Sequence, residues 1–94
     1  MASTVTVMVP TALRQFVGGQ EEVAFGGGTV GEVLAQLTTE YGDLRKHLYK
    51  DNGQLRNFVN IYLNDEDIRY LKGAETELSD GDEVSILPAL AGGV

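Results

Sequence analysis

The chain contains no cysteine, and this absence excludes several kinds of chemistry at once. Without cysteine there is no disulfide, no thiolate metal site, no iron–sulfur ligation and no cysteine nucleophile. Basic residues are also scarce, because 7 Lys and Arg stand against 14 Asp and Glu, for a formal net charge of −7. Phosphate binding needs clustered Lys and Arg, so we expect no nucleic acid partner.

Two targeting features are missing as well. Residues 1–7 lack a basic region followed by an apolar stretch, so no signal peptide is evident. No apolar run approaches the length of a membrane span. The expectation is therefore a cytoplasmic protein that does not bind a membrane. Its 94 residues, 43% of them hydrophobic, suit a single folded domain with one modest core.

Alternation of apolar and polar residues predicts a set of short strands. The predicted strands cover residues 3–9, 20–25, 57–63, 68–70 and 83–88. Pro10 ends the first strand, and residues 11–19 read as a long loop with Leu13 and Phe16 tucked under the domain. The first two strands are expected to pair as a hairpin. Residues 64–67 are expected to form an acidic turn before the strand at 68–70.

One segment has the pattern of a good helix. Thr29 and Glu32 form a Thr-x-x-Glu capping box. The apolar residues of one helical face follow at the spacing i, i+3, i+4, i+7 and i+11: Val30, Val33, Leu34, Leu37 and Tyr41. Gly42 is expected to stop this helix, which is predicted over Val30 to Tyr41, and residues 44–49 are expected to add a short turn. The order of elements predicts an α+β domain, with one helix across one face of the sheet.

Candidate catalytic or metal-binding residues are sparse. His47, the single histidine, is expected to be a solvated residue of a surface turn, and the run at 26–28 is expected to be a flexible lead into the helix rather than a phosphate cradle. The acidic run 65–67 could bind a hard cation, although a solvated turn is favoured. The acidic residues at 80–83 are interpreted in the same way. Nothing resembles an assembled active site, which favours a protein that is acted upon or binds, and not an enzyme.

The sequence ends in Gly92 and Gly93, followed by Val94. Two glycines without a Cβ leave the chain thin and flexible, so such a tail can thread a narrow tunnel and present a terminal carboxylate to an activating enzyme. A frayed terminus is the plain alternative. We divide the chain into a folded domain, residues 1–88, and a flexible tail, residues 89–94.

Several segments together resemble the ubiquitin-like sulfur carriers, a family that includes the small subunit of molybdopterin synthase and the thiamine-pathway carrier. The segments are Asp80-Gly81-Asp82-Glu83-Val84, Ile86-Leu87-Pro88-Ala89 and Ala91-Gly92-Gly93. The likeness is greatest to carriers of O-phosphoserine-dependent cysteine biosynthesis, on Val9-Pro10-Thr11, Leu13-Arg14, Gly18-Gly19-Gln20 and residues 56–67. The resemblance covers essentially the whole chain and implies the β-grasp fold, with a mixed sheet of four to five strands.

The resemblance also implies a cycle of activation and transfer. An adenylating enzyme similar to ubiquitin activators would use ATP to adenylate the Gly93 carboxylate, and a sulfur donor would displace AMP to leave a thiocarboxylate. In the cysteine pathway the sulfur would attack an aminoacrylate on a pyridoxal-phosphate synthase, and a peptidase would release cysteine. The carrier itself would hold no permanent cofactor.

Val94 departs from the family pattern, because an amide at Gly93 cannot be adenylated as a carboxylate. Val94 is either removed by a metalloprotease, or blocks activity in this form, or is an artificial addition. Other functions share the tail chemistry: a ubiquitin-like modifier joined through Gly93 to lysines, or a carrier for molybdopterin, thiamine or another pathway. A plain β-grasp interaction module is a further alternative.

A partner-binding surface follows from strand alternation. If Val84 and Ile86 face the helix, Leu87 faces the open side of the sheet, together with Phe58 and Tyr62 of the neighbouring strand. An exposed apolar patch of this kind often marks a partner site, and it would suit a partner with an apolar centre and a basic rim. Leu90 is expected to join the same contact, whereas Ala91 is assigned with Gly92 and Val94 to the tail itself.

Overall fold

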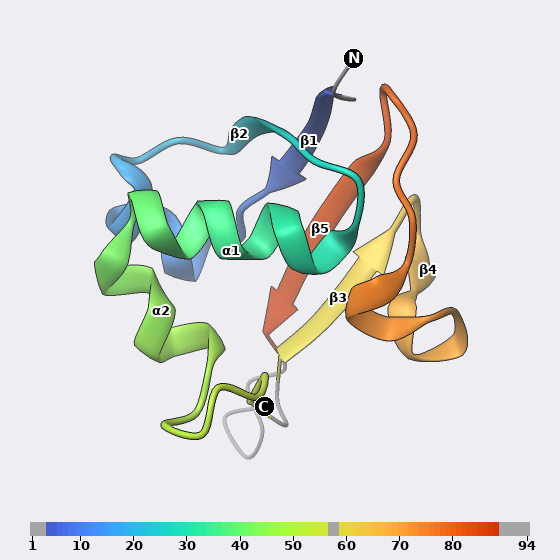
Figure 1. Ribbon diagram of the computed structural model, residues 1–94. Helices are drawn as coiled ribbons and strands as arrows, with labels where there is room; N and C mark the ends of the chain where they lie inside the picture. The colour runs from blue at the N-terminus through green and yellow to red at the C-terminus, as the bar shows by residue number, and fades with distance from the viewer. Residues whose placement is uncertain (1–3, 57–58, 89–94) are drawn as a thin grey trace.

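The computed structural model describes residues 4–56 and 59–88 (Figure 1). The elements follow one another as β1 (Thr4–Met8), the 3-10 helix η1 (Thr11–Val17), β2 (Glu22–Gly26), α1 (Val30–Glu40), α2 (Gly42–Leu48), β3 (Val59–Leu63), β4 (Glu66–Asp67), the 3-10 helices η2 (Ile68–Tyr70) and η3 (Gly73–Glu75), and β5 (Glu83–Pro88). No helix within these two described ranges is long and apolar enough to cross a membrane.

The strands form one mixed sheet in the order β2-β1-β5-β3-β4. β1 and β5 run parallel, and the other three neighbouring pairs are antiparallel. The predicted hairpin of the first two strands is confirmed, with Val5 opposite Phe25. Helix α1 crosses one face of the sheet (Figure 1). The central position of β5 matters for function, since the tail follows directly after it.

Helix α1 begins where the sequence predicts. The Thr29 hydroxyl accepts a hydrogen bond from the Glu32 amide at 3.2 Å, and the Glu32 carboxylate accepts one from the Thr29 amide at 3.2 Å. This reciprocal pair satisfies two amides that have no partner within the helix. The Gly28 amide also donates to the Glu32 carboxylate, at 2.7 Å. The glycine run is therefore held as the lead into α1.

The predicted role of Gly42 is wrong. Tyr41 closes α1, and its amide still donates to the Leu37 carbonyl at 2.9 Å. Gly42 is the first residue of α2 and does not adopt the left-handed conformation of a helix-ending glycine. Leu44 and Leu48, spaced i and i+4, are both fully buried, so the next segment gains a core-facing side by folding as a second helix.

Residues 11–17 were expected to be loop and instead form the 3-10 helix η1. Leu13 and Val17 face inward from it, which confirms that Leu13 is tucked under the domain. Gly18 ends the segment at φ 69°, a backbone conformation that glycine adopts without strain. A short helix with two buried residues replaces a loop because it buries apolar side chains while pairing its own backbone groups.

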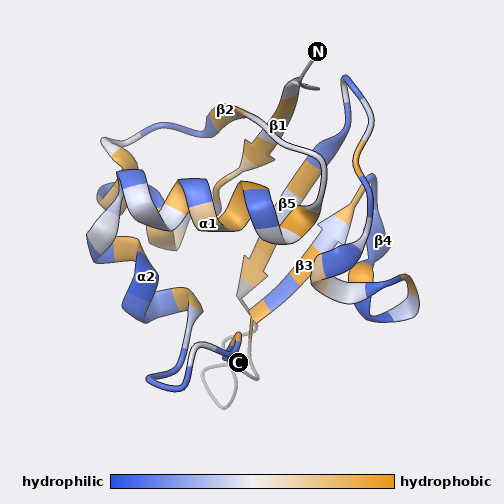
Figure 2. Cartoon of the chain, in the orientation of Figure 1, coloured by the Kyte–Doolittle hydropathy of each residue, from blue (hydrophilic) through white to orange (hydrophobic). Residues whose placement is uncertain are grey.

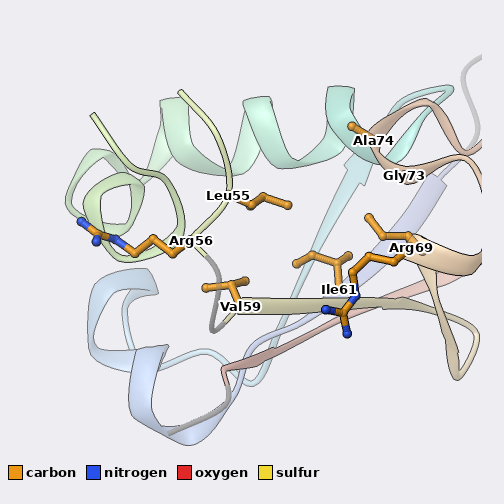
Figure 3. A pocket seen from close by; sticks show the side chains of 8 residues that line it. Leu55, Arg56, Val59, Ile61, Arg69, Gly73 and Ala74 are labelled. Carbon is orange, nitrogen blue, oxygen red and sulfur yellow. The ribbon is translucent and has the colours of Figure 1, made fainter. Parts of the chain in front are cut away.

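The return strand predicted at residues 68–70 is also wrong. Asn64 and Asp65 both have positive φ, 49° and 73°, and form a two-residue turn. The return strand β4 therefore starts directly after this turn, and it covers only Glu66–Asp67. The Asp67 carboxylate then accepts the Arg69 amide at 2.9 Å and starts η2. Arg69 lies beside β3, near Ile61 (Figure 3).

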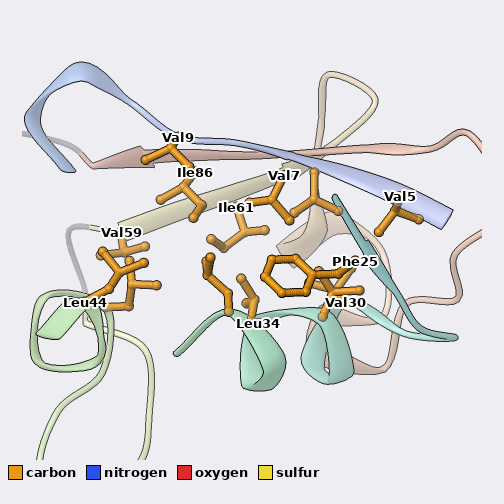
Figure 4. Close-up of a cluster of buried hydrophobic side chains, with 14 of the residues drawn as sticks. Val5, Val7, Val9, Phe25, Val30, Leu34, Leu44, Val59, Ile61 and Ile86 are labelled. Carbon is orange, nitrogen blue, oxygen red and sulfur yellow. The ribbon is translucent and has the colours of Figure 1, made fainter. Parts of the chain in front are cut away.

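The core fills the space between the sheet and the two α-helices (Figure 4). Hydrophobic positions recur along β1, β3 and β5 (Figure 2). The largest fully buried side chains are Leu34, Leu37, Leu44, Leu48, Ile61 and Ile86. Val84 and Ile86 face this core as predicted, and Val59 and Ile61 do the same from β3. Leu63 is only partly buried at the margin of the core.

Candidate functional site: the open sheet face and the base of the tail

The tail is attached to the end of the central strand of the sheet. β5 lies between β1 and β3, and its last residue, Pro88, is in register with Val59. The predicted activation site Gly93, with Leu90, Ala91, Gly92 and Val94, lies outside the described residues. β1 pairs with β5 only as far as Ser85, while β3 pairs with it up to Pro88, so the residue before the tail is held by β3. A paired strand end gives the following residues a fixed starting point, which suits a segment that a partner must capture.

The two faces of β5 differ as predicted. Ile86 is 1% exposed and pairs with Ile61 on the core side. Leu87 is 48% exposed and pairs with Asn60 on the open side. An exposed leucine by itself is ordinary on a protein surface. Its position immediately before the base of the tail is what makes it a candidate contact.

Tyr62 shares the open face with Leu87, as predicted, and is partly buried there. Tyr62 is opposite Ser85 on β5, and Met8 of β1 is opposite the same serine from the other side. Met8 therefore belongs to this face, between strands that are far apart in sequence. Sequence reasoning missed Met8, although its place between the inward-facing Val7 and Val9 was a signal for it. Phe58, predicted for the same patch, lies outside the described residues.

The Asp-Gly-Asp motif holds the opposite end of β5. The Asp80 carboxylate accepts the Thr4 amide at 2.9 Å, which ties the turn to β1. The Asp82 carboxylate accepts the side-chain amide of Asn64 at 2.9 Å, which ties the turn to the end of β3. Gly81 occupies the turn at φ 89°, a conformation that favours glycine. The motif thus aligns β5 with both of its neighbours.

The acidic turn at 65–67 has a similar structural role. The Asp67 carboxylate accepts hydrogen bonds from the Arg69 guanidinium on both oxygens, from Nε to Oδ1 at 3.1 Å and from Nη2 to Oδ2 at 2.6 Å, a bidentate arrangement. These side-chain hydrogen bonds, with the one from the Arg69 amide, hold the pKa of Asp67 below its usual value. Among residues 4–56 and 59–88, no group of three His, Asp or Glu side chains could hold a metal ion.

His47 does not lie in a solvated surface turn. It belongs to α2, is partly buried, and stacks on Phe16 with 4.2 Å between the ring centroids. This contact joins α2 to η1. His47 therefore has a packing role. Among the described residues, no side chain forms a hydrogen bond with its ring.

A cavity of about 430 Å³ lies on the helix side of the sheet, beside β3 (Figure 3). It is lined by Leu55, Arg56, Val59, Ile61, Ile68, Arg69, Gly73 and Ala74. Val59, Ile61 and Ile68 of this lining belong to the buried core. Arg69 at its rim is already engaged by Asp67, and Arg56 donates to a backbone carbonyl of α2. The residues that line this cavity therefore include no pair of side chains that could act together in catalysis.

A helix laid across a mixed five-stranded sheet, with a glycine tail after the central strand, defines the ubiquitin-like β-grasp proteins. The chain belongs to the ThiS family, whose profile matches residues 7–93. That match ends at the second glycine of the tail. The resemblance to sulfur carriers noted in the sequence is thereby confirmed.

Individual relatives agree with this assignment. The chain is 47% identical over 91 residues to the sulfur carrier protein CysO of Mycobacterium tuberculosis, covering 95% of this chain and 98% of CysO. In the crystal structure of the Amycolatopsis orientalis BexX/CysO complex, the matching chain is 41% identical, with a TM-score of 0.84, over 92% of this chain and 96% of that one. The small archaeal modifier protein SAMP1 of Methanosarcina acetivorans is 32% identical, with a TM-score of 0.85 and 97% of each chain covered.

Proposed function

We propose that this protein is a sulfur carrier whose C-terminal glycine, Gly93, is activated and converted to a thiocarboxylate. The observation that carries the proposal is the family match through Gly93, on a chain whose tail follows the central strand β5. The 47% identity to a protein named a sulfur carrier supports the same function. The protein is then a cosubstrate and not a catalyst.

The proposed chemistry needs only the terminal carboxylate of the carrier. A carboxylate oxygen of Gly93 attacks the α-phosphorus of ATP on an adenylating enzyme, and pyrophosphate leaves. Hydrosulfide, the sulfur donor at the sulfide level, then attacks the acyl carbon, the bond to AMP breaks, AMP leaves, and a thiocarboxylate remains after loss of the proton. The acyl adenylate makes AMP a good leaving group, whereas free carboxylate offers none. Because ATP is the second substrate, we propose that activation takes place in the cytoplasm.

Val94 must be removed before this step, since its amide bond occupies the Gly93 carboxyl group. We propose that a metalloprotease hydrolyses this bond and frees the carboxylate. The acceptor proposed for the sulfur is an aminoacrylate on a pyridoxal-phosphate cysteine synthase, in line with the likeness to CysO. Carriage as a protein-bound thiocarboxylate keeps the sulfur from escaping as free sulfide.

The proposed docking face for the activating enzyme and the synthase is the open side of the sheet around Leu87, Tyr62 and Met8. These residues lie on three adjacent strands, β5, β3 and β1, close to the base of the tail. A partner that covers this face can bury apolar surface while it takes the tail into its active site. The matching A. orientalis chain is solved in complex with a partner, BexX.

The experiment that tests the function is ATP–pyrophosphate exchange with the adenylating enzyme of the same organism. A chain that ends at Gly93 should support exchange, and the chain that retains Val94 should not. Addition of a sulfur donor should then raise the mass of the shorter chain by one replacement of oxygen by sulfur. Lack of exchange by both chains would contradict the proposal, and equal exchange by both would contradict the processing step.

A ubiquitin-like modifier is the second candidate, because SAMP1 shares 32% identity over nearly the whole chain. Both functions begin with the same adenylation. Mass spectrometry of the protein recovered from its native cells separates them: a carrier is found with a C-terminal thiocarboxylate, and a modifier is found joined through Gly93 to lysines of other proteins.

A further inference from the structure

Positive charge in this acidic protein is concentrated in one segment. Four of the 7 Lys and Arg lie between positions 45 and 56, with Asp51 as the single acidic residue there, so this segment carries a charge of +3 (four minus one) in a chain of −7. The four are Arg45, Lys46, Lys50 and Arg56, and we name them the basic cluster. Arg45 and Lys46 are exposed, and Lys50 and Arg56 are partly exposed.

Hydrogen bonds of Arg56 connect α2, which carries Arg45 and Lys46, to the strand beside the end of β5. The Arg56 side chain donates through Nε to the Lys46 carbonyl at 2.7 Å, and its amide donates to the Leu48 carbonyl at 2.8 Å. The Arg56 carbonyl in turn accepts the Val59 amide at 3.0 Å, and Val59 is in register with Pro88. Arg56 of the basic cluster is therefore connected to the end of β5 through Val59.

The opposite end of β5 is acidic. The two turns beside its start, together with the first residues of the strands that follow them, carry five acidic residues and no Lys or Arg: Asp65, Glu66, Asp80, Asp82 and Glu83. Asn64 connects the two turns, since its amide donates to the Glu83 carbonyl at 2.9 Å and its side chain donates to Asp82. The molecule is thus negative where β5 starts and positive where β5 ends. Such an asymmetry orients an approaching partner.

Three of the four cluster residues line a shallow pocket, together with one acidic residue. A pocket of about 260 Å³ is lined by Gly42, Arg45, Lys46, Tyr49, Lys50 and Asp51. The Arg45 guanidinium lies over the Tyr49 ring, 5.6 Å from its centroid. The helix dipole favours cations in the last turn of α2, which accounts for Arg45 and Lys46. Lys50 lies beyond the helix end, so the dipole does not account for it.

We propose that the basic cluster is a docking surface for an acidic patch on the protein partner that receives the C-terminal tail. The inference rests on the proposed function, because a partner that takes the tail must approach the end of β5. The acidic net charge of the chain led us to expect a basic rim on the partner. The basic cluster refines this expectation, because the part of the partner that faces α2 must be acidic. A protein patch fits better than nucleic acid, since the remainder of the chain repels a polyanion.

The test measures ATP–pyrophosphate exchange with chains that end at Gly93 and determines the carrier concentration that gives half-maximal exchange. Lys46→Glu reverses a charge within the basic cluster. Lys72→Glu makes the same change at an exposed lysine outside it and is the matched control. At about 0.05 M salt we expect Lys46→Glu to raise the half-maximal concentration about fivefold, and at about 0.5 M salt less than about twofold, because salt screens exposed charges. Lys72→Glu should change the half-maximal concentration less than about twofold at both salt concentrations.

The outcomes separate the two proposals. Lack of exchange by the wild-type chain would overturn the proposed function and this surface with it. If the wild-type chain shows normal exchange and Lys46→Glu and Lys72→Glu have equal effects, the proposed surface alone is overturned. The surface is also overturned if the protein binds single-stranded DNA, and Lys46→Glu abolishes that binding but leaves exchange unchanged. Thermal melting checks folding, and Lys50→Glu, beyond the end of α2, replaces Lys46→Glu if that variant melts early.

Discussion

Ile86 and Leu87 are neighbours on β5, yet Ile86 is 1% exposed within the core and Leu87 is 48% exposed on the opposite face of the sheet. Successive side chains of a strand point to opposite faces, so the two residues separate the two tasks of β5. Ile86 belongs to the packing that holds the domain together. Leu87 belongs to the surface from which the tail continues.

A charge placed at each of these positions should have opposite effects on folding and function. Ile86→Asp should cost at least about 4 kcal/mol, because an unpaired carboxylate would be buried, and the domain should unfold or melt far earlier. Leu87→Asp should cost about 1 kcal/mol or less and should weaken activation by the adenylating enzyme. Chemical denaturation and ATP–pyrophosphate exchange measure the two effects. If Leu87→Asp unfolds the domain as badly as Ile86→Asp, the assigned docking face is wrong.

The capping box of α1 should make a measurable contribution to stability. Thr29→Ala removes the hydroxyl that accepts the Glu32 amide and should lower the free energy of unfolding by about 1 kcal/mol. Thr39→Ala, on the exposed side of the same helix, removes a threonine hydroxyl without removing the cap and is the matched control. Urea denaturation compares them. A larger loss for Thr39→Ala than for Thr29→Ala would contradict the capping role.

The Asp67–Arg69 pair should make stability depend on acid pH. The pKa of Asp67 is lowered in the folded protein by its hydrogen bonds from Arg69. The contribution of Asp67 to stability is therefore fully present above the pKa of the unfolded chain, about 4, and is lost as the pH falls through the lower pKa of the folded protein. Asp67→Asn should therefore lower the melting temperature at neutral pH, and the gap to wild type should narrow as pH falls below about 4. The difference in melting temperature between Arg69→Gln and wild type should narrow with falling pH in the same way. A gap that stays constant with pH would refute this account.

The tail should be sensitive to side-chain size at Gly92. Gly92 follows β5 by four positions, so we expect Gly92→Ala to leave the melting temperature unchanged. An added Cβ restricts the backbone and would crowd a narrow tunnel, so ATP–pyrophosphate exchange should fall strongly. Ala91→Gly, which removes a Cβ nearby, is the control and should retain exchange. A melting temperature lowered by many degrees in Gly92→Ala would instead give Gly92 a structural role in the domain.

The sequence by itself determined the features that depend on neighbouring residues. Thr29 and Glu32 are three positions apart, so their capping box and the start of α1 were predictable, and strand alternation correctly placed Ile86 inward and Leu87 outward. Gly42 could not be assigned in this way. A glycine suits both a helix end and a helix start, and the burial of Leu44 and Leu48 against distant residues decided between them.

Only the tertiary structure decided which distant residues share a surface. Strand pairing places Met8 and Tyr62 on either side of Ser85, although 54 positions separate them (62 minus 8). Hydrogen bonds of Arg56 likewise connect α2 to Val59, which is in register with the last residue of β5. Local propensity carries no information on such pairings, because strand register is set by burial of a whole face at once. The chemistry of the tail is therefore apparent in the sequence, while the surface around it is a property of the fold.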